Sequence, residues 1–322
     1  MPFRNIHGQD KAVELLSRNL KEKSFYSTYL FLGPDGVGKK LAAITFAKAI
    51  NCVSSGEKPC TVCPSCRKID SGNHPDVVLT EPKNRSNTIG ISEIRKILQK
   101  AGLKAYEAGK KVFIIDGAHI MTPEAANAFL KTLEEPPRDT IFILIATSKE
   151  LLLSTVVSRA VIIRFRSAPL AACEKVLSEK FNIDRKEARM LSVFSSGRIG
   201  RALEMREKDL IRKKNAALDA LFGKNKPYSG SPKEDIEFLL SYLRDLFVYK
   251  ATGRKDLIFN ADRTGEIAVL KDRYSFDRID ELIQKVVTLE SYMDHNVNPK
   301  IVFDVIKNSL AELTPFNPGP KG

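Results

Sequence analysis

The first half of the chain alternates short apolar runs with longer segments in which apolar residues recur at helical spacing. Apolar runs of this kind are typical of strands buried on both faces of a parallel sheet, and the longer segments of amphipathic helices. The strands are expected at residues 29–32, 76–79, 112–116, 141–146 and 161–165. The helices between them are expected at residues 10–20, 39–49, 91–103 and 123–133. This order predicts an α/β region in which helices cover a parallel sheet.

The pattern changes after residue 167. From there on, apolar residues keep helical spacing, for example over residues 236–247 and 283–292, and no run predicts a strand. A segment rich in proline and glycine predicts a loop at 225–232. The tail at 317–322 has the same composition and is expected to be disordered. The second half is therefore expected to be all-helical.

Composition describes an ordinary globular protein. The 322 residues are 43% hydrophobic and 28% charged, which allows two or three domains with a substantial core. The 52 Lys and Arg residues exceed the 39 Asp and Glu residues and leave a net charge of +13. This balance favours an acidic partner such as nucleic acid. The basic residues are spread along the chain, however, which is also expected of a solvated surface.

The sequence contains no segment suited to a membrane. The longest apolar run, at residues 141–146, is far shorter than the roughly 20 residues that span a bilayer. The start, residues 1–5, lacks the apolar core of a secretory signal. We therefore expect a cytoplasmic protein without a membrane partner, whose five cysteines stay reduced.

A glycine-rich loop follows the first expected strand. Residues 33–40, GPDGVGKK, match the phosphate-binding pattern G-x-x-x-x-G-K. In this pattern the backbone N–H groups around Gly33, Gly36 and Gly38 cradle phosphates, and Lys39 reaches the terminal phosphates. The next position normally carries the Ser or Thr hydroxyl that binds Mg²⁺. Lys40 stands there instead, and an ammonium group has no lone pair to offer a metal.

A second departure follows the strand expected at 112–116. Asp116 ends this strand, where a magnesium-directing carboxylate is expected, and Gly117 stands where a hydrolase usually has a Glu that polarises water. ATP hydrolysis needs both the metal and an oriented water, so Lys40 and Gly117 together argue against it. Two interpretations stay open: a subunit that binds ATP or ADP without hydrolysing it, and a loop kept only as architecture. His119 is a further candidate base, although a lone histidine is more often structural.

Four cysteines lie close together after the loop and its helix. Cys52, Cys60, Cys63 and Cys66 have spacings that let several thiolates reach one metal ion. Four sulfur ligands favour tetrahedral Zn²⁺, and a site with no open position is structural rather than catalytic. An iron–sulfur cluster is the rival interpretation, although the spacing differs from the ferredoxin patterns. Cys173 is expected to be a buried thiol.

Together these features resemble the delta-prime family of bacterial DNA polymerase III clamp-loader subunits, which are AAA+ proteins. The segments that carry the resemblance are Gly8-Gln9, the strand and loop at 29–39, His74-Pro75-Asp76 after the cysteines, AANAFLKTLEEPP at 125–137, Ser158-Arg159, YLRDL at 242–246 and NVNP at 296–299. They span nearly the whole chain and are densest before residue 170. Ala160 departs from the family's Ser-Arg-Cys pattern.

The resemblance implies three domains. They are an AAA+ P-loop core over residues 1–167 with a zinc module inserted at about 52–66, a helical lid over 168–208, and a helical collar domain over 209–316. The tail at 317–322 would follow the collar domain.

The resemblance also implies a function. The chain would be a non-hydrolysing stator that helps gamma/tau and delta subunits load the sliding clamp onto primed DNA. Arg159 would act as an arginine finger, inserted into the ATP site of a neighbouring subunit. An ordinary surface arginine is the plain alternative. Arg198 and Arg201 lie where the lid often supplies a sensor arginine, although they equally suit the exposed start of a helix.

Two further functions remain as alternatives. One is an ATP-hydrolysing gamma/tau-type motor of the same complex; that family keeps the hydroxyl after the loop lysine and an Asp-Glu pair, and Lys40 and Gly117 break both patterns. The other is a stand-alone zinc-containing module that binds nucleic acid.

Overall fold

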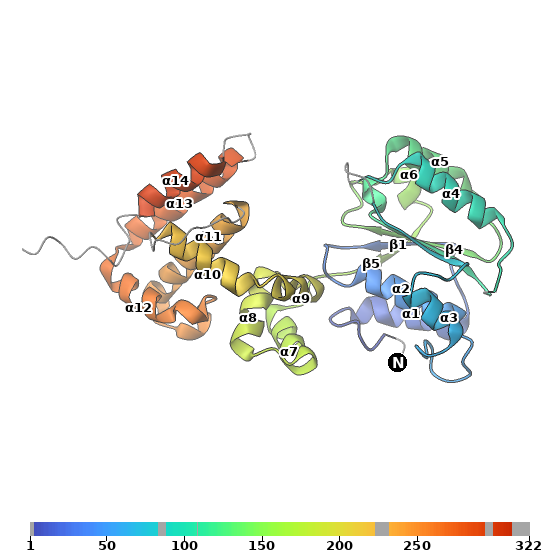
Figure 1. Ribbon diagram of the computed structural model, residues 1–322, viewed down its shortest axis with the longest axis horizontal. Helices are drawn as coiled ribbons and strands as arrows, with labels where there is room; N and C mark the ends of the chain where they lie inside the picture. Colours follow the sequence, from blue (N-terminus) through green and yellow to red (C-terminus); the bar gives the residue numbers. More distant parts are fainter. Residues whose placement is uncertain (1–2, 83–87, 108, 223–231, 294–298, 311–322) are drawn as a thin grey trace, which may run out of the picture. The chain divides into compact units, whose positions relative to one another are not determined.

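The computed structural model describes residues 3–82, 88–107, 109–222, 232–293 and 299–310. The chain divides into two compact units (Figure 1). The first holds Met1–Val176 and Ser196–Arg201, and the second holds Leu177–Ser195 and Ala202–Gly322. The tail expected at 317–322, the NVN of the segment at 296–298 and all of the expected loop except Pro232 lie outside the described residues.

The first unit is built on a five-stranded sheet whose neighbouring strands are all parallel, in the order β2-β3-β4-β1-β5. The strands are β1 (Thr28–Leu32), β2 (Val77–Thr80), β3 (Lys111–Asp116), β4 (Thr140–Ala146) and β5 (Val161–Arg164). Each lies within two residues of its expected position. The α/β fold with a parallel sheet is therefore confirmed.

Alternate residues of the strands supply two separate cores, as the two-residue repeat of a strand requires. Tyr29 and Phe31 of β1 belong to one buried cluster with residues of α1 and α2, whereas Leu30 and Leu32 belong to a second cluster with residues of α4 and α5. Figure 1 shows α1, α2 and α3 on one side of the sheet and α4, α5 and α6 on the other. This two-sided burial explains why the strands are nearly continuous apolar runs.

Helix α5 begins at a recognisable signal. Thr122 caps α5 by accepting from the N–H of Ala125, and Pro123 occupies the first helical position. The elements are α1 (Asp10–Glu22), α2 (Lys39–Asn51), α3 (Pro64–Asp70), α4 (Ile91–Gly102), η1 (Ala118–Ile120), α5 (Pro123–Glu134) and α6 (Ser154–Val157). The four expected helices are confirmed. The short α3 and α6 were not expected, because one or two helical turns leave no periodic pattern.

From α7 onward, the described part of the chain contains helices and no strand, as expected. The elements are α7 (Leu170–Phe181), α8 (Arg185–Phe194), α9 (Ile199–Glu207), α10 (Leu210–Leu221), α11 (Pro232–Thr252), η2 (Lys255–Leu257), η3 (Ala261–Arg263), α12 (Thr264–Arg273), α13 (Phe276–Met293) and α14 (Pro299–Leu310). Helix α11 packs against α10, α12, α13 and α14. No helix in the described ranges has both the length and the apolar character needed to cross a membrane.

The second unit also has polar features. The fully buried ammonium of Lys214 binds Asn260 Oδ1 at 3.0 Å and Asp262 Oδ1 at 2.7 Å, so a buried charge is paired.

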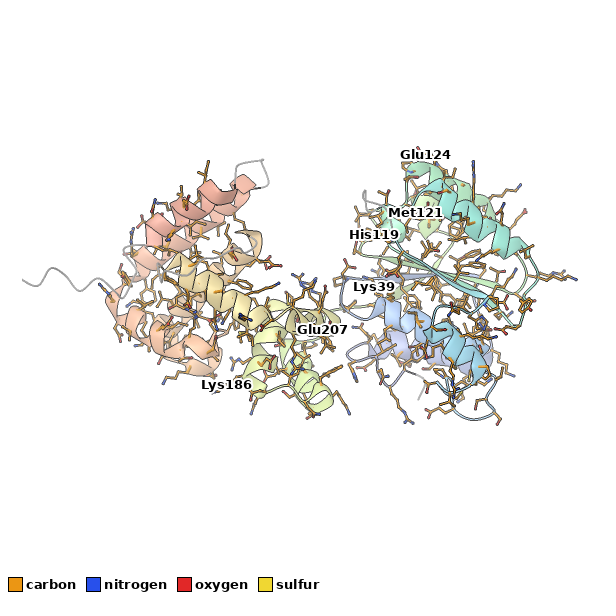
Figure 2. All side chains as sticks on the ribbon, in the orientation of Figure 1. Lys39, His119, Met121, Glu124, Lys186 and Glu207 are labelled. Carbon is orange, nitrogen blue, oxygen red and sulfur yellow. The ribbon has the colours of Figure 1, made fainter. Side chains whose placement is uncertain are left out.

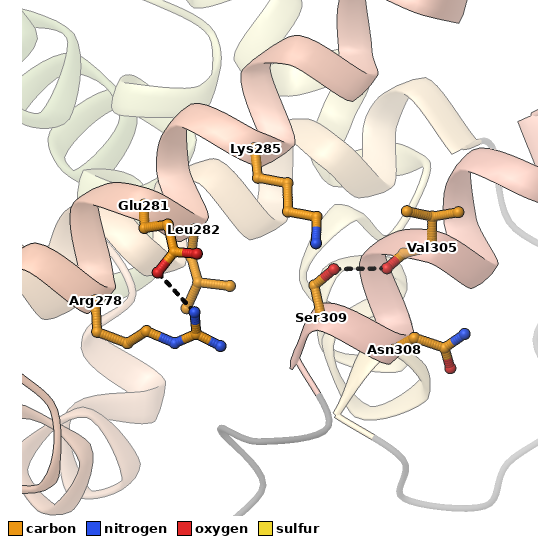
Figure 3. A pocket seen from close by; sticks show the side chains of 7 residues that line it. All are labelled: Arg278, Glu281, Leu282, Lys285, Val305, Asn308 and Ser309. Carbon is orange, nitrogen blue, oxygen red and sulfur yellow. Dashed lines mark hydrogen bonds and ion pairs between the residues drawn. The ribbon is translucent and has the colours of Figure 1, made fainter.

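A hollow of about 410 Å³ lies between α13 and α14 (Figure 3). Its polar lining includes Arg278, which binds Glu281 at 2.6 Å, and Ser309. None of the site residues expected from the sequence lies there.

Candidate functional site

The phosphate loop leaves β1 at Leu32 and enters α2 at Lys39. Two of its glycines lie where no side chain fits. A Cβ at Gly33 would lie 2.2 Å from the carbonyl oxygen of Phe165, and one at Gly36 would lie 2.7 Å from the nitrogen of Arg201. Both glycines also have positive φ angles, of 154° and 79°. The close approach of Phe165 and Arg201 therefore requires glycine at these positions.

Lys39 lies inside the loop rather than in solvent, with 5% of its surface exposed (Figure 2). Its ammonium donates to the carbonyl oxygens of Gly33 and Pro34, the latter at 2.8 Å, and to Asp35 Oδ1 at 3.2 Å. Burial lowers the pKa of Lys39, and the Asp35 carboxylate opposes this shift. The expected phosphate lysine is thus aimed at the centre of the loop and held by the loop's own oxygens.

Lys40 points to a different place, the carboxyl edge of the sheet. Its ammonium binds Glu81 Oε1 and lies 3.9 Å from Asp116 Oδ2. Burial is the main cause that raises the pKa of Asp116; the Glu81 carboxylate adds to it and the Lys40 ammonium opposes it. The residues present do not fit Mg²⁺ at this position, because an ammonium and not a hydroxyl faces the carboxylates.

Gly117, which follows Asp116, has a left-handed backbone with φ 90° and ψ 36°. A Cβ there would lie 3.1 Å from Cδ1 and Cγ1 of Ile120. Nearby, burial lowers the pKa of His119, and its Nδ1 has no hydrogen-bond partner among the described residues. Position 117 thus lacks the carboxylate that a hydrolase has after the strand aspartate, and its backbone disfavours any residue except glycine there.

The first turn of α9 lies against the loop within the first unit. The N–H of Gly200 donates to the carbonyl oxygen of Gly36 at 2.8 Å. A Cβ at Gly36 would lie 2.7 Å from the Cβ and the backbone nitrogen of Arg201, the next residue. Arg201, one of the two arginines proposed from the sequence as sensors, therefore lies beside the loop.

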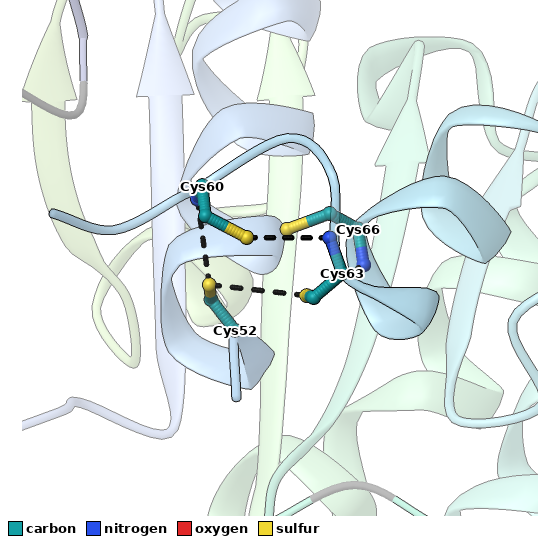
Figure 4. A group of neighbouring side chains, drawn as sticks. All are labelled: Cys52, Cys60, Cys63 and Cys66. Atoms are coloured by element: carbon teal, nitrogen blue, oxygen red, sulfur yellow. Dashed lines mark hydrogen bonds between the residues drawn. The ribbon is translucent and has the colours of Figure 1, made fainter. Parts of the chain in front are cut away.

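The four cysteines expected to bind a metal come together between α2 and α3 (Figure 4). Their sulfur atoms all lie within 4.8 Å of one another, and those of Cys52 and Cys63 are 4.0 Å apart. Sulfurs around tetrahedral Zn²⁺, with Zn–S distances of ~2.3 Å, lie ~3.8 Å apart, so the cluster fits such an ion with a small contraction. The cluster can hold a structural metal ion. The fifth cysteine, Cys173, is buried elsewhere.

The thiols have pKa shifts in opposite directions. Burial acts to raise the pKa of Cys63, but backbone hydrogen bonds from Cys66 and Val53 outweigh it, and the pKa falls to about 6. Burial and a hydrogen bond with Cys63 raise the pKa of Cys66 to about 12. Thiolate is the form that binds metals, and Cys63 is the cysteine whose surroundings most favour it.

Polar contacts join this cysteine module to the sheet. His74, 4% exposed, lies 3.1 Å from Ser65 Oγ through Nε2, and its Nδ1 accepts from the N–H of Asp76 at 3.2 Å. Lys48 of α2 binds both oxygens of Asp70, at the end of α3, at 2.7 Å. The His-Pro-Asp segment therefore fixes α3 against the start of β2.

Arg159 lies in the turn between α6 and β5. It donates to Glu134 Oε1 at 2.6 Å and to the carbonyl oxygen of Thr155 at 2.9 Å. Residues Tyr29 and Val161 are paired across the parallel strands β1 and β5. Arg159 therefore lies at the amino end of β5, whereas the phosphate loop follows the carboxyl end of β1. At ~3.3 Å per residue, the four-residue paired segment alone separates them by about 10 Å.

Two residues with clear contacts were not expected from the sequence. Glu81, which pairs with Lys40, directly follows β2 and could have been found by aligning the ends of β2 and β3. The sequence indicates no contact for Gln9; its side chain donates to the carbonyl oxygen of Arg166 at 2.7 Å and accepts from that residue's N–H at 3.0 Å. This pair ties the N-terminal segment to the residues after β5.

The strand order, the phosphate loop after β1 and the aspartate at the end of β3 define a P-loop protein with an AAA+-like fold. Residues 8–169 match the family model "DNA polymerase III, delta subunit", and residues 214–306 match "DNA polymerase III, delta subunit, C terminal". The chain belongs to the DNA polymerase III delta/delta-prime subunit family.

The chain is also similar to individual proteins. The DNA polymerase III subunit delta' of Bacillus subtilis (strain 168) is 33% identical over 66% of this chain and 64% of that protein. The DNA polymerase III subunit tau of the same organism is 28% identical over 94% of this chain and 60% of that protein. The chain thus spans less than two thirds of the length of either relative. A gamma subunit-related protein from Thermotoga maritima has a solved structure that is 19% identical, with 94% of this chain and 99% of that chain covered and a TM-score of 0.48.

Proposed function

We propose that the chain is a clamp-loader subunit of DNA polymerase III that does not hydrolyse ATP and supplies Arg159 to the ATP site of a neighbouring subunit. One observation carries this proposal. The Lys40 ammonium binds Glu81 and lies 3.9 Å from Asp116, where a hydrolase would hold magnesium. Membership of the DNA polymerase III delta/delta-prime family supports placing the chain in a clamp-loader complex.

The absence of hydrolysis follows from what the chemistry needs. Phosphoryl transfer to water requires a metal that neutralises the phosphates and a group that orients the water. Lys40 offers no metal ligand, and Gly117 offers no carboxylate. The loop backbone and Lys39 remain suited to phosphate, so nucleotide binding without turnover is compatible with the geometry.

The position of Arg159 supports a role in a neighbouring subunit. It lies at the opposite end of the sheet from its own phosphate loop, so its guanidinium cannot act there. Its side chain is 33% exposed, and its acidic partner Glu134 is 51% exposed, so the pair is accessible from outside. A guanidinium inserted from outside stabilises the charge that develops on a transferring phosphate.

The proposed partners follow from the same assignment. They are gamma/tau and delta subunits, the sliding clamp and primed DNA, with the net charge of +13 favouring contacts to DNA phosphates. We propose that the chain has three domains, which are a core over residues 1–167, a lid over 168–208 and a collar over 209–316. The apolar helix faces of the collar would pack against those of sister subunits.

For the metal, we propose a single structural Zn²⁺ on Cys52, Cys60, Cys63 and Cys66. Thiolates are soft ligands that suit Zn²⁺, and four of them leave no open position for catalysis. The ion would join α2 to α3 and hold the module in place.

The function is tested by reconstituting the loader with gamma/tau and delta subunits and measuring ATP turnover. In the R159A variant we expect turnover at the neighbouring site to fall on the order of 10³-fold. R159K keeps the charge but loses the forked geometry, so it should restore little. R164A, on the exposed end of β5, is the matched control and should change nothing. Unchanged turnover in R159A complexes that assemble normally would contradict the finger.

A motor subunit is the second candidate, because the tau relative matches over 94% of this chain. ATP turnover by the isolated chain in Mg²⁺ separates the two. Turnover that K39A abolishes would favour the motor, and no turnover favours the proposed role.

A further inference from the structure

Two carboxylates lie side by side at the carboxyl edge of the sheet. Strands β2 and β3 are parallel neighbours, and Thr80 pairs with Ile115. Glu81 and Asp116 are the next residues on each strand, so they stand opposite each other. Neighbouring strands are ~4.8 Å apart, a distance at which two carboxylates repel each other and attract a shared cation.

The cation that faces them belongs to the chain. Lys40 extends from the first turn of α2, and its ammonium binds Glu81 and lies 3.9 Å from Asp116. Lys39, one residue earlier, turns instead into the loop and binds backbone oxygens. The two consecutive lysines thus have separate contacts: Lys39 binds oxygens of the phosphate loop, and Lys40 binds the carboxylate pair.

We infer that the Lys40 ammonium occupies a latent divalent-cation site formed by Glu81 and Asp116, and that it excludes Mg²⁺ and Mn²⁺ from that site as a tethered substitute. Carboxylate oxygens are the ligands that these hard cations prefer. Replacing Lys40 with a neutral residue removes the bound charge and leaves two carboxylates without a counter-ion. A threonine at this position also adds a hydroxyl oxygen on the same helical turn.

What binds to Glu81 and Asp116 therefore depends on residue 40. With Lys40 present, its own ammonium neutralises the two carboxylates. Without Lys40, the two carboxylates bind a hard divalent cation. This inference extends the proposal that the chain does not hydrolyse ATP, because Lys40 directly follows the lysine of the phosphate loop. It needs no partner subunit, however, so either proposal can fail without the other.

The test measures Mn²⁺ binding by the 322-residue chain loaded with zinc, using electron paramagnetic resonance to count free Mn²⁺. The K40T and K40A variants should each gain one Mn²⁺ site with a Kd at least about tenfold below any binding by the wild type, which corresponds to about 1.4 kcal/mol. K40T should bind more tightly than K40A, because of its hydroxyl. The K40T/E81Q double variant should lose the gained site.

Matched controls make each outcome decisive. K11T removes a lysine from an exposed position of α1 and should bind Mn²⁺ like the wild type. Circular dichroism and zinc content check that each variant is folded, and K40A replaces K40T if the threonine variant does not fold. Wild-type Mn²⁺ binding as tight as that of K40T would overturn the inference, as would the absence of a gained site in both folded variants. A gained site that survives E81Q would place the metal elsewhere and also overturn it.

Discussion

Arg159 and Glu134 form an ion pair of 2.6 Å between the turn before β5 and the last residue of α5. Both side chains are accessible, with 33% and 51% of their surfaces exposed. An exposed pair of this kind contributes at most about 1 kcal/mol to stability, because water and salt screen it. In the proposed role, the guanidinium would therefore leave Glu134 for a phosphate of the neighbouring subunit at low cost.

The first prediction concerns this pair. E134Q should change the free energy of unfolding by less than about 1 kcal/mol, since Arg159 keeps its bond to the carbonyl oxygen of Thr155. Urea unfolding measures it, with E135Q as the control at the neighbouring exposed position. A loss above about 2 kcal/mol would show that Glu134 is a structural partner of Arg159 and not a resting contact.

The second prediction concerns Gly117. G117E places a carboxylate where hydrolases have one, yet it should not create turnover in the isolated chain, because Lys40 remains. It should also destabilise the fold by about 1–3 kcal/mol, since φ is 90° and Ile120 leaves little space. G109E is the control, because a Cβ at Gly109 meets nothing within 4 Å. Magnesium-dependent turnover by G117E would contradict the account.

The sheet, the phosphate loop and the residues around Lys40 and Gly117 show which features a sequence can predict and which it cannot. The strands and the loop were predictable because buried parallel strands are continuous apolar runs and because the loop pattern has fixed spacing. The partner of Lys40 was not, because a single carboxylate after a short strand matches no motif and becomes significant only through the register with Asp116. The left-handed backbone at Gly117 was likewise invisible, since a glycine does not reveal which φ it adopts.

In the cysteine module too, sequence spacing predicts some features, whereas others depend on contacts between segments. Spacing alone predicted that Cys52, Cys60, Cys63 and Cys66 converge, because nearby thiols share one turn. Helix α3 escaped prediction because its seven residues form too short a pattern. The fixing of α3 through His74 depends on a contact between segments and could not be derived from either one. Arg159 was identified by resemblance alone.

The third prediction concerns the metal. C63S should lose most of the zinc that the wild-type chain binds and should unfold at a lower temperature, because binding free energy at such a site stabilises the fold. C173S is the control and should keep its zinc, since Cys173 lies outside the cluster. Zinc is measured by release to a chromogenic chelator and stability by thermal unfolding. Equal zinc contents in the two variants would refute the four-cysteine site.

The fourth prediction concerns pH. Burial lowers the pKa of His74 in the folded chain, against the opposing effect of Glu107, and its Nδ1 must stay unprotonated to accept from Asp76. The unfolded chain therefore binds this proton more readily. The stabilising contribution is present above the unfolded pKa of about 6.5 and is lost as the pH falls below it.

The measurement compares unfolding in urea at pH 7 and pH 5 for the wild type and H74Q. The wild type should lose more stability over this interval, because glutamine does not titrate. Zinc release affects both chains and cancels in the comparison. An equal loss in the two chains would show that His74 does not contribute to the acid sensitivity.

In the proposed function this chain completes a neighbour's ATP site without using its own, and ATP turnover by the whole loader distinguishes the two sites. Reconstituted loaders carrying wild-type, K39A or R159A chains are compared for ATP turnover in Mg²⁺. We expect R159A to lower turnover and K39A to leave it unchanged. A fall in turnover with K39A, together with none in R159A, would contradict it.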